Sequence, residues 1–178
     1  VRHALAFHPS ELQCASVGPD GYVRLWALPG GGAGRGFGLA GMQQLPGACG
    51  AVCYDREGAL IAAAEACAPP GVRPRFFVLS CPDLLKRHEG HAGPRAPSAH
   101  ASGGGVHAMR FSPSGKLLAL GCSDGRIYLR DAAQGFAPLG ALSADGGVPA
   151  HGAPVVAIDW AADGSHTLRS GCAAGGLC

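Results

Sequence analysis

The clearest hydrophobic pattern lies between Gly105 and Asp131, where three apolar runs alternate with short polar turns. The runs are residues 106–111, 116–121 and 126–131. Proline and glycine in the two joints supply the backbone dihedrals of tight turns. The middle run is apolar at successive residues rather than alternate ones, which is typical of a strand covered on both faces. The pattern predicts a meander of short antiparallel strands packed between neighbouring sheets, as in a propeller blade.

The same arrangement recurs along the chain. An aromatic residue followed by a polar turn and an apolar run occurs at Phe7, Tyr54, Phe111 and Trp160. A second landmark, Asp-Gly before an alternating run, occurs at residues 20–21 and 124–125. The separation of 104 residues between Phe7 and Phe111 also separates the two Asp-Gly landmarks. Two independent features with one offset across two repeats indicate a period of about 50 residues, which is in the range of propeller blades.

The period predicts an all-β fold class, a β-propeller fragment of about 3.5 four-stranded blades. Its parts are blade 1 at 1–48, blade 2 at 49–90, a flexible insertion at 91–104, blade 3 at 105–149 and partial blade 4 at 150–178. The expected strands are 2–7, 12–17, 22–28, 37–45, 51–54, 59–64, 75–80, 83–87, 106–111, 116–121, 126–131, 136–142, 154–160 and 165–171. Because propellers typically close with about four to eight blades, we expect the rest of the ring to lie outside this chain.

Composition narrows the class of protein. Glycine (30 residues) and proline (14) make up about a quarter of the 178 residues, but 47% are hydrophobic, which argues against disorder throughout. The formal net charge of +2 is too small for a nucleic-acid footprint, and no apolar run is long enough for a membrane span. The eight cysteines lie mostly in apolar runs, and asparagine is absent, which favours a reducing, cytoplasmic compartment.

One segment of the first repeat resembles a WD repeat. Residues 23–26, Val-Arg-Leu-Trp, follow an Asp-Gly turn, as in the third strand of such repeats. The structural repeat residues that the resemblance implies are Ser16, Asp20, Trp26, Asp124, Asp131, His151 and Trp160. The first three match members of the structural hydrogen-bond tetrad of WD repeats. In the third repeat only Asp124 matches the tetrad, and Arg130 stands where tryptophan is usual.

Within WD-repeat proteins, the chain is most similar to the echinoderm microtubule-associated protein-like family. Three segments carry the similarity, at residues 75–90, 109–128 and 151–177. The first-strand ending Ile-Asp-Trp at 158–160 is the most specific part, because generic repeats usually have Phe-Ser there. The resemblance implies a non-enzymatic scaffold that binds tubulin or microtubules, without a cofactor, in the cytoplasm, on the cytoskeleton or in the cilium. A generic WD-repeat scaffold in another ciliary or signalling complex is the alternative.

Five cationic residues gather in the second repeat and its insertion: Arg73, Arg75, Lys86, Arg87 and Arg95. The simpler interpretation is solvated loop charge that keeps apolar blades soluble. The functional interpretation is a partner-binding patch for an acidic protein surface, such as the tails of tubulin. Both interpretations stay open at the level of sequence.

Three short motifs invite chemical interpretations. Residues 121–125 match G-x-S-x-G, but a nucleophile elbow needs a following helix, whereas residues 126–130 alternate like a strand. A hydrolase using Ser123 is therefore a remote alternative that predicts a helix after Gly125. Residues 36–41 match G-x-G-x-x-G without the helix that a dinucleotide site requires. The cluster His88-Glu89-Gly90-His91 is interpreted as a solvated loop, since its histidines are three apart rather than four, and no metal is predicted.

Overall fold

The computed structural model describes residues 4–29, 36–93, 104–144, 148–163 and 165–175, and these form four antiparallel sheets. Blade I consists of β1 (Ala4–Phe7), β2 (Gln13–Val17), β3 (Tyr22–Ala27) and β4 (Gly38–Gln44). Blade II consists of β5 (Cys49–Tyr54), β6 (Leu60–Glu65), β7 (Arg75–Ser80) and β8 (Lys86–His91). Blade III consists of β9 (Val106–Phe111), β10 (Leu117–Cys122), β11 (Ile127–Asp131) and β12 (Ala137–Ala144), with the short β13 (Val148–Pro149) at its edge. Blade IV consists of β14 (Val155–Trp160) and β15 (Leu168–Cys172).

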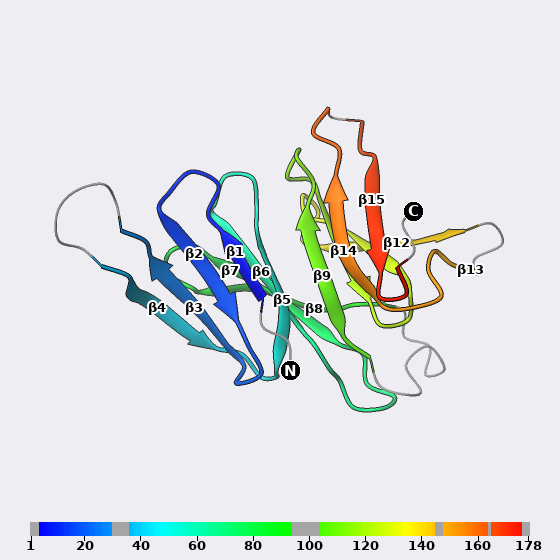
Figure 1. Cartoon of the computed structure of the whole chain (residues 1–178), viewed down its shortest axis with the longest axis horizontal. Helices are drawn as coiled ribbons and strands as arrows, with labels where there is room; N and C mark the ends of the chain where they lie inside the picture. The colour runs from blue at the N-terminus through cyan, green and yellow to red at the C-terminus, as the bar shows by residue number, and fades with distance from the viewer. Residues whose placement is uncertain (1–3, 30–35, 94–103, 145–147, 164, 176–178) are drawn as a thin grey trace.

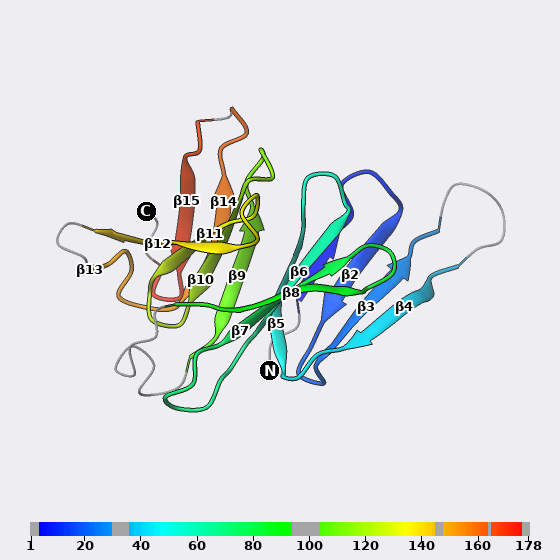
Figure 2. The same ribbon diagram turned by 180° about the vertical axis from the view of Figure 1, so that it is seen from behind.

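The blades fan out from a common row of inner strands. The first strands of the four blades, β1, β5, β9 and β14, contact one another in that order along the middle of the molecule (Figure 1). The view from behind shows the outer strands β4 and β12 to either side of this row (Figure 2). Each blade runs outward in chain order, which is the construction of a propeller. The predicted all-β propeller class is confirmed.

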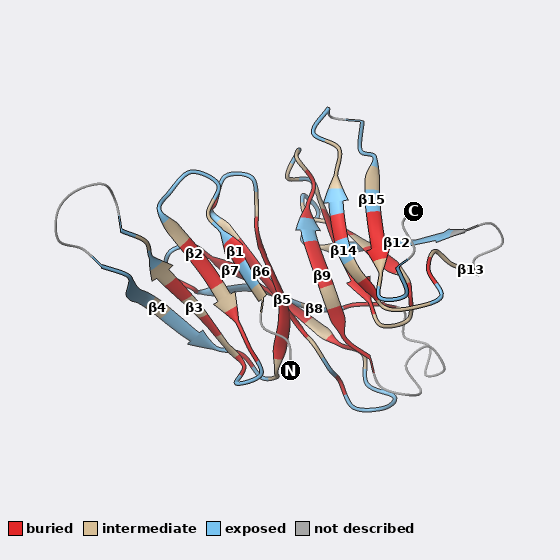
Figure 3. Cartoon of the chain, viewed as in Figure 1, coloured by how far each residue is buried: buried red, intermediate tan, exposed pale blue. Residues whose placement is uncertain are grey.

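The core lies in the seams between blades, and alternate residues of one strand serve different seams. In β7, Phe77 and Leu79 pack toward blade I, while Phe76 and Val78 pack toward blade III. In β10, Leu118 and Leu120 pack toward blade II, while Ala119 packs toward blade IV. Figure 3 shows buried residues along β2, β5 and β9 and exposed residues along β4. Coverage of both faces explains why the central strands are apolar at successive positions.

The outer strand of blade II differs from the sequence prediction. We expected it at residues 83–87, but β8 spans Lys86–His91. The preceding turn is closed by a hydrogen bond from the Leu84 amide to the Ser80 carbonyl at 2.8 Å, with φ of 55° at Leu84. The Leu84 side chain is buried in the seam with blade I. Leu84 is therefore a turn anchor rather than a strand residue, which displaces the strand along the chain.

The second strand of blade IV also begins later than predicted. Residues 165–171 were expected, but β15 spans Leu168–Cys172. The Ser165 amide donates to Asp163 Oδ1 at 2.9 Å, and the Ser165 hydroxyl contacts Thr167 Oγ1 at 2.8 Å. These local hydrogen bonds hold a turn in place of the first strand residues. Strand β13, which pairs with β12, was not predicted.

The two end blades present unlike faces. On the face of blade I turned away from blade II, four large apolar side chains are 50–65% exposed, namely Leu5, Phe7, Leu39 and Met42. On blade IV, cross-strand neighbours Asp159 and Arg169 are exposed and lie 3.7 Å apart. The open face of blade I is therefore largely apolar, with Arg24 beside Met42 as its charged residue, whereas blade IV displays a charged pair.

Candidate interaction surface at the rim of blade II

Arg75 lies inside an ion-pair network. Its Nη2 lies 2.6 Å and its Nε 2.9 Å from Oε1 of Glu65, a buried residue at the end of β6. Its Nη1 lies 3.5 Å from Oε1 of Glu89, whose other oxygen accepts a hydrogen bond from Lys86 at 2.8 Å. Hydrogen bonding to Glu65 raises the pKa of Arg75, and hydrogen bonding to Lys86 lowers the pKa of Glu89. Two cations of the predicted patch are thus neutralised within blade II.

The other predicted cations differ in their surroundings. Arg87 is exposed on β8, and Arg73 is half-buried just before β7. Neither makes an ion pair among the described residues. Arg95 lies outside the described residues, as do residues 94–103 of the predicted insertion. At the end of that insertion, Gly104 forms a β-bridge with Ala68. We call the edge of blade II that carries Arg73, Arg75, Lys86 and Arg87 its rim; Arg87 lies at the start of β8, whereas Arg75 pairs with His91 at its end.

A cavity of about 460 Å³ opens at this rim, between blades II and III. Arg73, Phe76 and residues 88–91 line it from blade II, and Arg130 and residues 135–138 line it from blade III. Phe136 packs against Phe76 and His88, with ring centroids 6.2 and 5.0 Å away. The cavity therefore combines aromatic walls with two guanidinium groups.

Arg130 is the most deeply placed cation of the cavity. The residue is 7% exposed, its Nη2 donates to the carbonyl of His91, and its guanidinium lies 5.7 Å from the centre of the Phe76 ring. Its Nε has no hydrogen-bond partner in the described part of the chain. Burial, with a smaller contribution from the charge of Arg73, lowers the pKa of Arg130.

The segment His88-Glu89-Gly90-His91 is a strand, which corrects our interpretation of it as a loop. His88 turns inward, where its ring lies 5.4 Å from that of Phe76, and Glu89 turns toward Arg75 and Lys86. Burial lowers the pKa values of both His88 and His91. Within the described residues, no group of three or more His, Cys, Asp or Glu side chains is placed to hold a metal ion.

The repeat residues of blade I are partly connected. The indole Nε1 of Trp26 donates to Ser16 Oγ at 2.8 Å, which joins β3 to β2. Asp20 instead binds Arg24, with the two side chains 2.6 Å apart, and accepts a hydrogen bond from the Tyr22 amide. The structure thus brings Ser16 and Trp26 together and places Asp20 in a separate turn contact.

The repeat residues of blades III and IV mainly stabilise turns and seams. Asp124 accepts hydrogen bonds from the Tyr128 hydroxyl at 2.5 Å and the Arg126 amide at 3.1 Å. Asp131 Oδ1 accepts two amide hydrogen bonds in the turn before β12. His151 Nε2 and Ser170 Oγ share a buried hydrogen bond of 2.8 Å. Trp160 Nε1 donates to the carbonyl of Arg110 in the neighbouring blade.

The G-x-S-x-G motif forms a hairpin. Strand β11 follows its last glycine, where a nucleophile elbow requires a helix, so the hydrolase alternative fails its own structural test. Ser123 Oγ lies 2.8 Å from His107 Nε2 and 2.9 Å from the Gly105 amide that donates to it. The serine thereby ties the β10–β11 turn to the start of β9. Residues 38–41 of the G-x-G-x-x-G match lie in strand β4.

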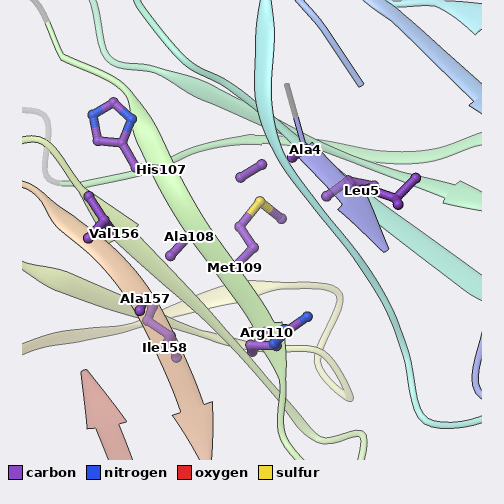
Figure 4. Close-up of a pocket in the computed structure, with 11 residues that line it drawn as sticks. Ala4, Leu5, His107, Ala108, Met109, Arg110, Val156, Ala157 and Ile158 are labelled. Atoms are coloured by element: carbon purple, nitrogen blue, oxygen red, sulfur yellow. The ribbon is translucent and has the colours of Figure 1, made fainter. Parts of the chain in front are cut away.

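A second cavity, of about 240 Å³, lies against the inner strands (Figure 4). Leu5 of β1 and residues 156–158 of β14 flank it on either side of β9, which contributes Met109. Its lining is mostly small and apolar, with His107 and Arg110 as the titratable groups. The described part of the chain holds no helix long and apolar enough to cross a membrane.

Two residues that set the charge of the rim, Glu65 and Arg130, were not predicted from the sequence. Glu65 directly follows the predicted strand 59–64, and nothing in the local sequence showed that it would bind Arg75. Arg130 was recognised as the residue in the usual tryptophan position, but its role in a cavity was not foreseen. The signal that could have identified it is the 104-residue offset, which aligns Arg130 with Trp26 and places it at a blade seam.

Comparisons with known proteins identify related sequences. A family model described as the anaphase-promoting complex subunit 4 WD40 domain matches residues 85–163. A ciliary WD repeat-containing protein, ctxp80, from Euplotoides octocarinatus is 37% identical over 73 residues, which are 41% of this chain and 9% of that protein. WD repeat-containing protein 1 from Bos taurus and from Rattus norvegicus is in each case 36% identical over 65 residues, 36% of this chain and 10% of that protein.

These matches agree with the architecture. The matched family residues run from β8 through blade III into blade IV, and the similar proteins are WD-repeat proteins. The aligned segments span about a tenth of the length of these relatives. The chain is therefore built of propeller blades and is similar to WD-repeat proteins, and its more specific similarity to the echinoderm microtubule-associated protein-like family stays a prediction.

Proposed function

We propose that this chain is a non-enzymatic part of a WD-repeat interaction scaffold that binds tubulin or microtubules through the rim of blade II. The observation that carries the proposal is the group of cations at this rim. Glu65 and Glu89 are paired with Arg75 and Lys86, whereas Arg73 and Arg87 have no carboxylate among the described residues. Exposed cations at the edge of a sheet favour the binding of an acidic protein surface.

The resemblance to the echinoderm microtubule-associated protein-like family supports tubulin as the partner. The proposed location is accordingly the cytoplasm, on the cytoskeleton. A second candidate is a scaffold in another ciliary or signalling complex, favoured by the similarity to a ciliary WD-repeat protein. In either case, the blades supply a rigid framework and the rim supplies recognition.

Co-sedimentation with microtubules tests the proposal. The sharpest variant is the double charge reversal Arg73→Glu with Arg87→Glu, because neither side chain belongs to an ion pair among the described residues. Arg75 is unsuitable for reversal, since a second carboxylate beside Glu65 would destabilise blade II. Lys116→Glu, on the exposed β9–β10 turn, is the matched control.

We expect the double reversal to weaken pelleting by about tenfold and the control to leave it within about twofold. Absence of pelleting by the unaltered protein would reject microtubules and leave the second candidate. Equal pelleting of the rim variant and the control would reject the rim as the binding surface.

A further inference from the structure

We infer that the cavity between blades II and III is a subsite for a glutamate or aspartate side chain on an extended acidic segment of a partner protein. The inference rests on the proposed scaffold function only in taking the ligand to be a protein. It adds a specific receptor, Arg130 with Arg73, to the exposed cations of the rim. The cavity volume of about 460 Å³ suits one or two side chains rather than a folded element.

The first argument is the uncompensated charge of Arg130. A buried guanidinium is costly unless its charge and its N–H groups are compensated. Among the described residues, Arg130 has one carbonyl acceptor, that of His91, and the face of the Phe76 ring. Arg73 lines the same cavity, and its charge adds to the cost of the Arg130 charge. An incoming carboxylate would compensate both guanidinium groups.

The second argument is that the cavity does not supply its own anion. Glu89 is the one acidic residue in the described lining, and its two oxygens face Lys86 and Arg75. His88 and His91 also line the cavity, and burial lowers the pKa of each, so both side chains are neutral near pH 7. The cavity therefore keeps a net positive charge.

The third argument favours a peptide over a free anion or a lipid headgroup. Phe76, Phe136 and Pro138 provide apolar walls for the methylene groups of an acidic side chain. Strand β8 ends its sheet, so one edge of its backbone pairs with no strand in the described chain. An extended segment can add to such an edge through main-chain hydrogen bonds while alternate side chains enter a neighbouring pocket. Figure 2 shows this edge strand lying next to blade III.

Fluorescence anisotropy with two labelled octapeptides tests the inference on the purified protein. One probe alternates glutamate with glycine, and the other alternates glutamine with glycine. We expect saturable binding of the glutamate probe and at least about tenfold weaker binding of the glutamine probe. Arg130→Gln and Arg73→Gln should each weaken the glutamate probe by about tenfold. Lys116→Gln, on the exposed β9–β10 turn and outside the cavity lining, should change it by less than about twofold.

Each result supports or overturns the subsite. Thermal unfolding shows whether Arg130→Gln folds. If it does not fold, Arg73→Gln tests the subsite instead, because Arg73 is half-buried and forms no hydrogen bond in the described part of the chain. Equal binding of the two probes, or unchanged binding by Arg73→Gln, overturns the inference. Binding of inorganic phosphate at these arginines without binding of the glutamate probe overturns the assignment to a peptide. Peptide binding without microtubule pelleting rejects the proposed partner alone, and the reverse result rejects the subsite alone.

Discussion

Arg75 and Glu65 are joined by three hydrogen bonds across neighbouring strands. Nε and Nη2 of Arg75 both reach Oε1 of Glu65, and the Arg75 amide donates to Oε2 at 2.8 Å. The Glu65 side chain is 6% exposed and that of Arg75 is 30% exposed. A carboxylate at this depth requires compensation, and Arg75 provides most of it. The arginine that the sequence placed in a partner-binding patch thus has a structural role as well.

Replacement of Arg75 by methionine should destabilise blade II. The substitution keeps the packing of the stem but, among the described residues, leaves the Glu65 carboxylate with the hydrogen bond from the residue 75 amide alone. We expect a loss of about 3 kcal/mol in the free energy of unfolding, measured by urea titration. Arg73→Met should cost less than about 0.5 kcal/mol, because Arg73 makes no ion pair among the described residues.

A double-mutant cycle separates this pair from its surroundings. Combining Arg75→Met with Glu65→Met removes the uncompensated carboxylate, so the double variant should be more stable than Arg75→Met alone. Equal losses for Arg75→Met and Arg73→Met would show that the ion pair contributes nothing to the stability of the blade.

Two buried cysteines should make stability depend on alkaline pH. Burial is the main cause that raises the pKa values of Cys49 and Cys53 from 9.0 to about 12. Above about pH 9 these thiols ionise in the unfolded chain but stay protonated in the folded one, so the unfolded state binds fewer protons. The free energy of unfolding should therefore be level near pH 7 to 8 and fall above about pH 9, with a slope approaching about 1.4 kcal/mol per pH unit for each cysteine.

Urea unfolding under reducing conditions at several values between about pH 7 and 10 measures this dependence. Near the upper limit unfolded tyrosines also begin to ionise, and because burial raises the pKa values of Tyr54 and Tyr128, these residues add to the slope there. Cys53→Ala should reduce the slope by at most about 1.4 kcal/mol per pH unit, since one thiol is removed while burial also raises the pKa values of Cys14, Cys81 and Cys122. A slope that Cys53→Ala leaves unchanged would contradict the assignment to these thiols.

Gly125 should be far less tolerant of alanine than Gly115. Both have positive φ, 75° and 71°, so each substitution carries a backbone cost of about 1 kcal/mol. A Cβ on Gly125 would lie 1.9 Å from the His151 carbonyl oxygen, whereas nothing lies within 4 Å of one on Gly115. We expect Gly125→Ala to cost at least about 2 kcal/mol more than Gly115→Ala, because blade IV must move away.

Hydrogen exchange of the β14 and β15 amides measures the local effect of this movement. Gly125→Ala should speed exchange in blade IV while leaving β5 and β6 unchanged. Similar thermal shifts for the two alanine variants would mean that the turn and His151 are not in close contact in solution.

The open face of blade I should promote self-association. Leu5, Phe7, Leu39 and Met42 are each at least half exposed there, and contiguous apolar surface favours association. Phe7→Ser with Leu39→Ser should lower the weight-average mass in light scattering at high concentration. Val72→Ser is the control, because Val72 is an exposed apolar residue of the loop before β7. A mass that changes equally in the two variants would exclude this face as the cause.

The periodicity of the sequence was sufficient to predict the blades. Leu118 and Leu120 serve one seam and Ala119 the next, and this two-sided burial is what a run of successive apolar residues expresses. The predicted bounds of β7 and β9, residues 75–80 and 106–111, agree with the structure. Strand β8 was misplaced because the burial of Leu84 is set by blade I and not by its sequence neighbours.

The sequence alone determined the fold class, the repeat and the resemblance to WD-repeat proteins, because all three are written in the order of apolar residues and turns along the chain. The tertiary structure decided which cations are left without a carboxylate partner and can therefore contact an acidic protein. Arg75 is bound to Glu65, ten positions away, and Arg130 meets Phe76 and His91 of another blade. Whether a charge is compensated depends on the distances between side chains of different strands and blades, and these distances are set when the blades pack.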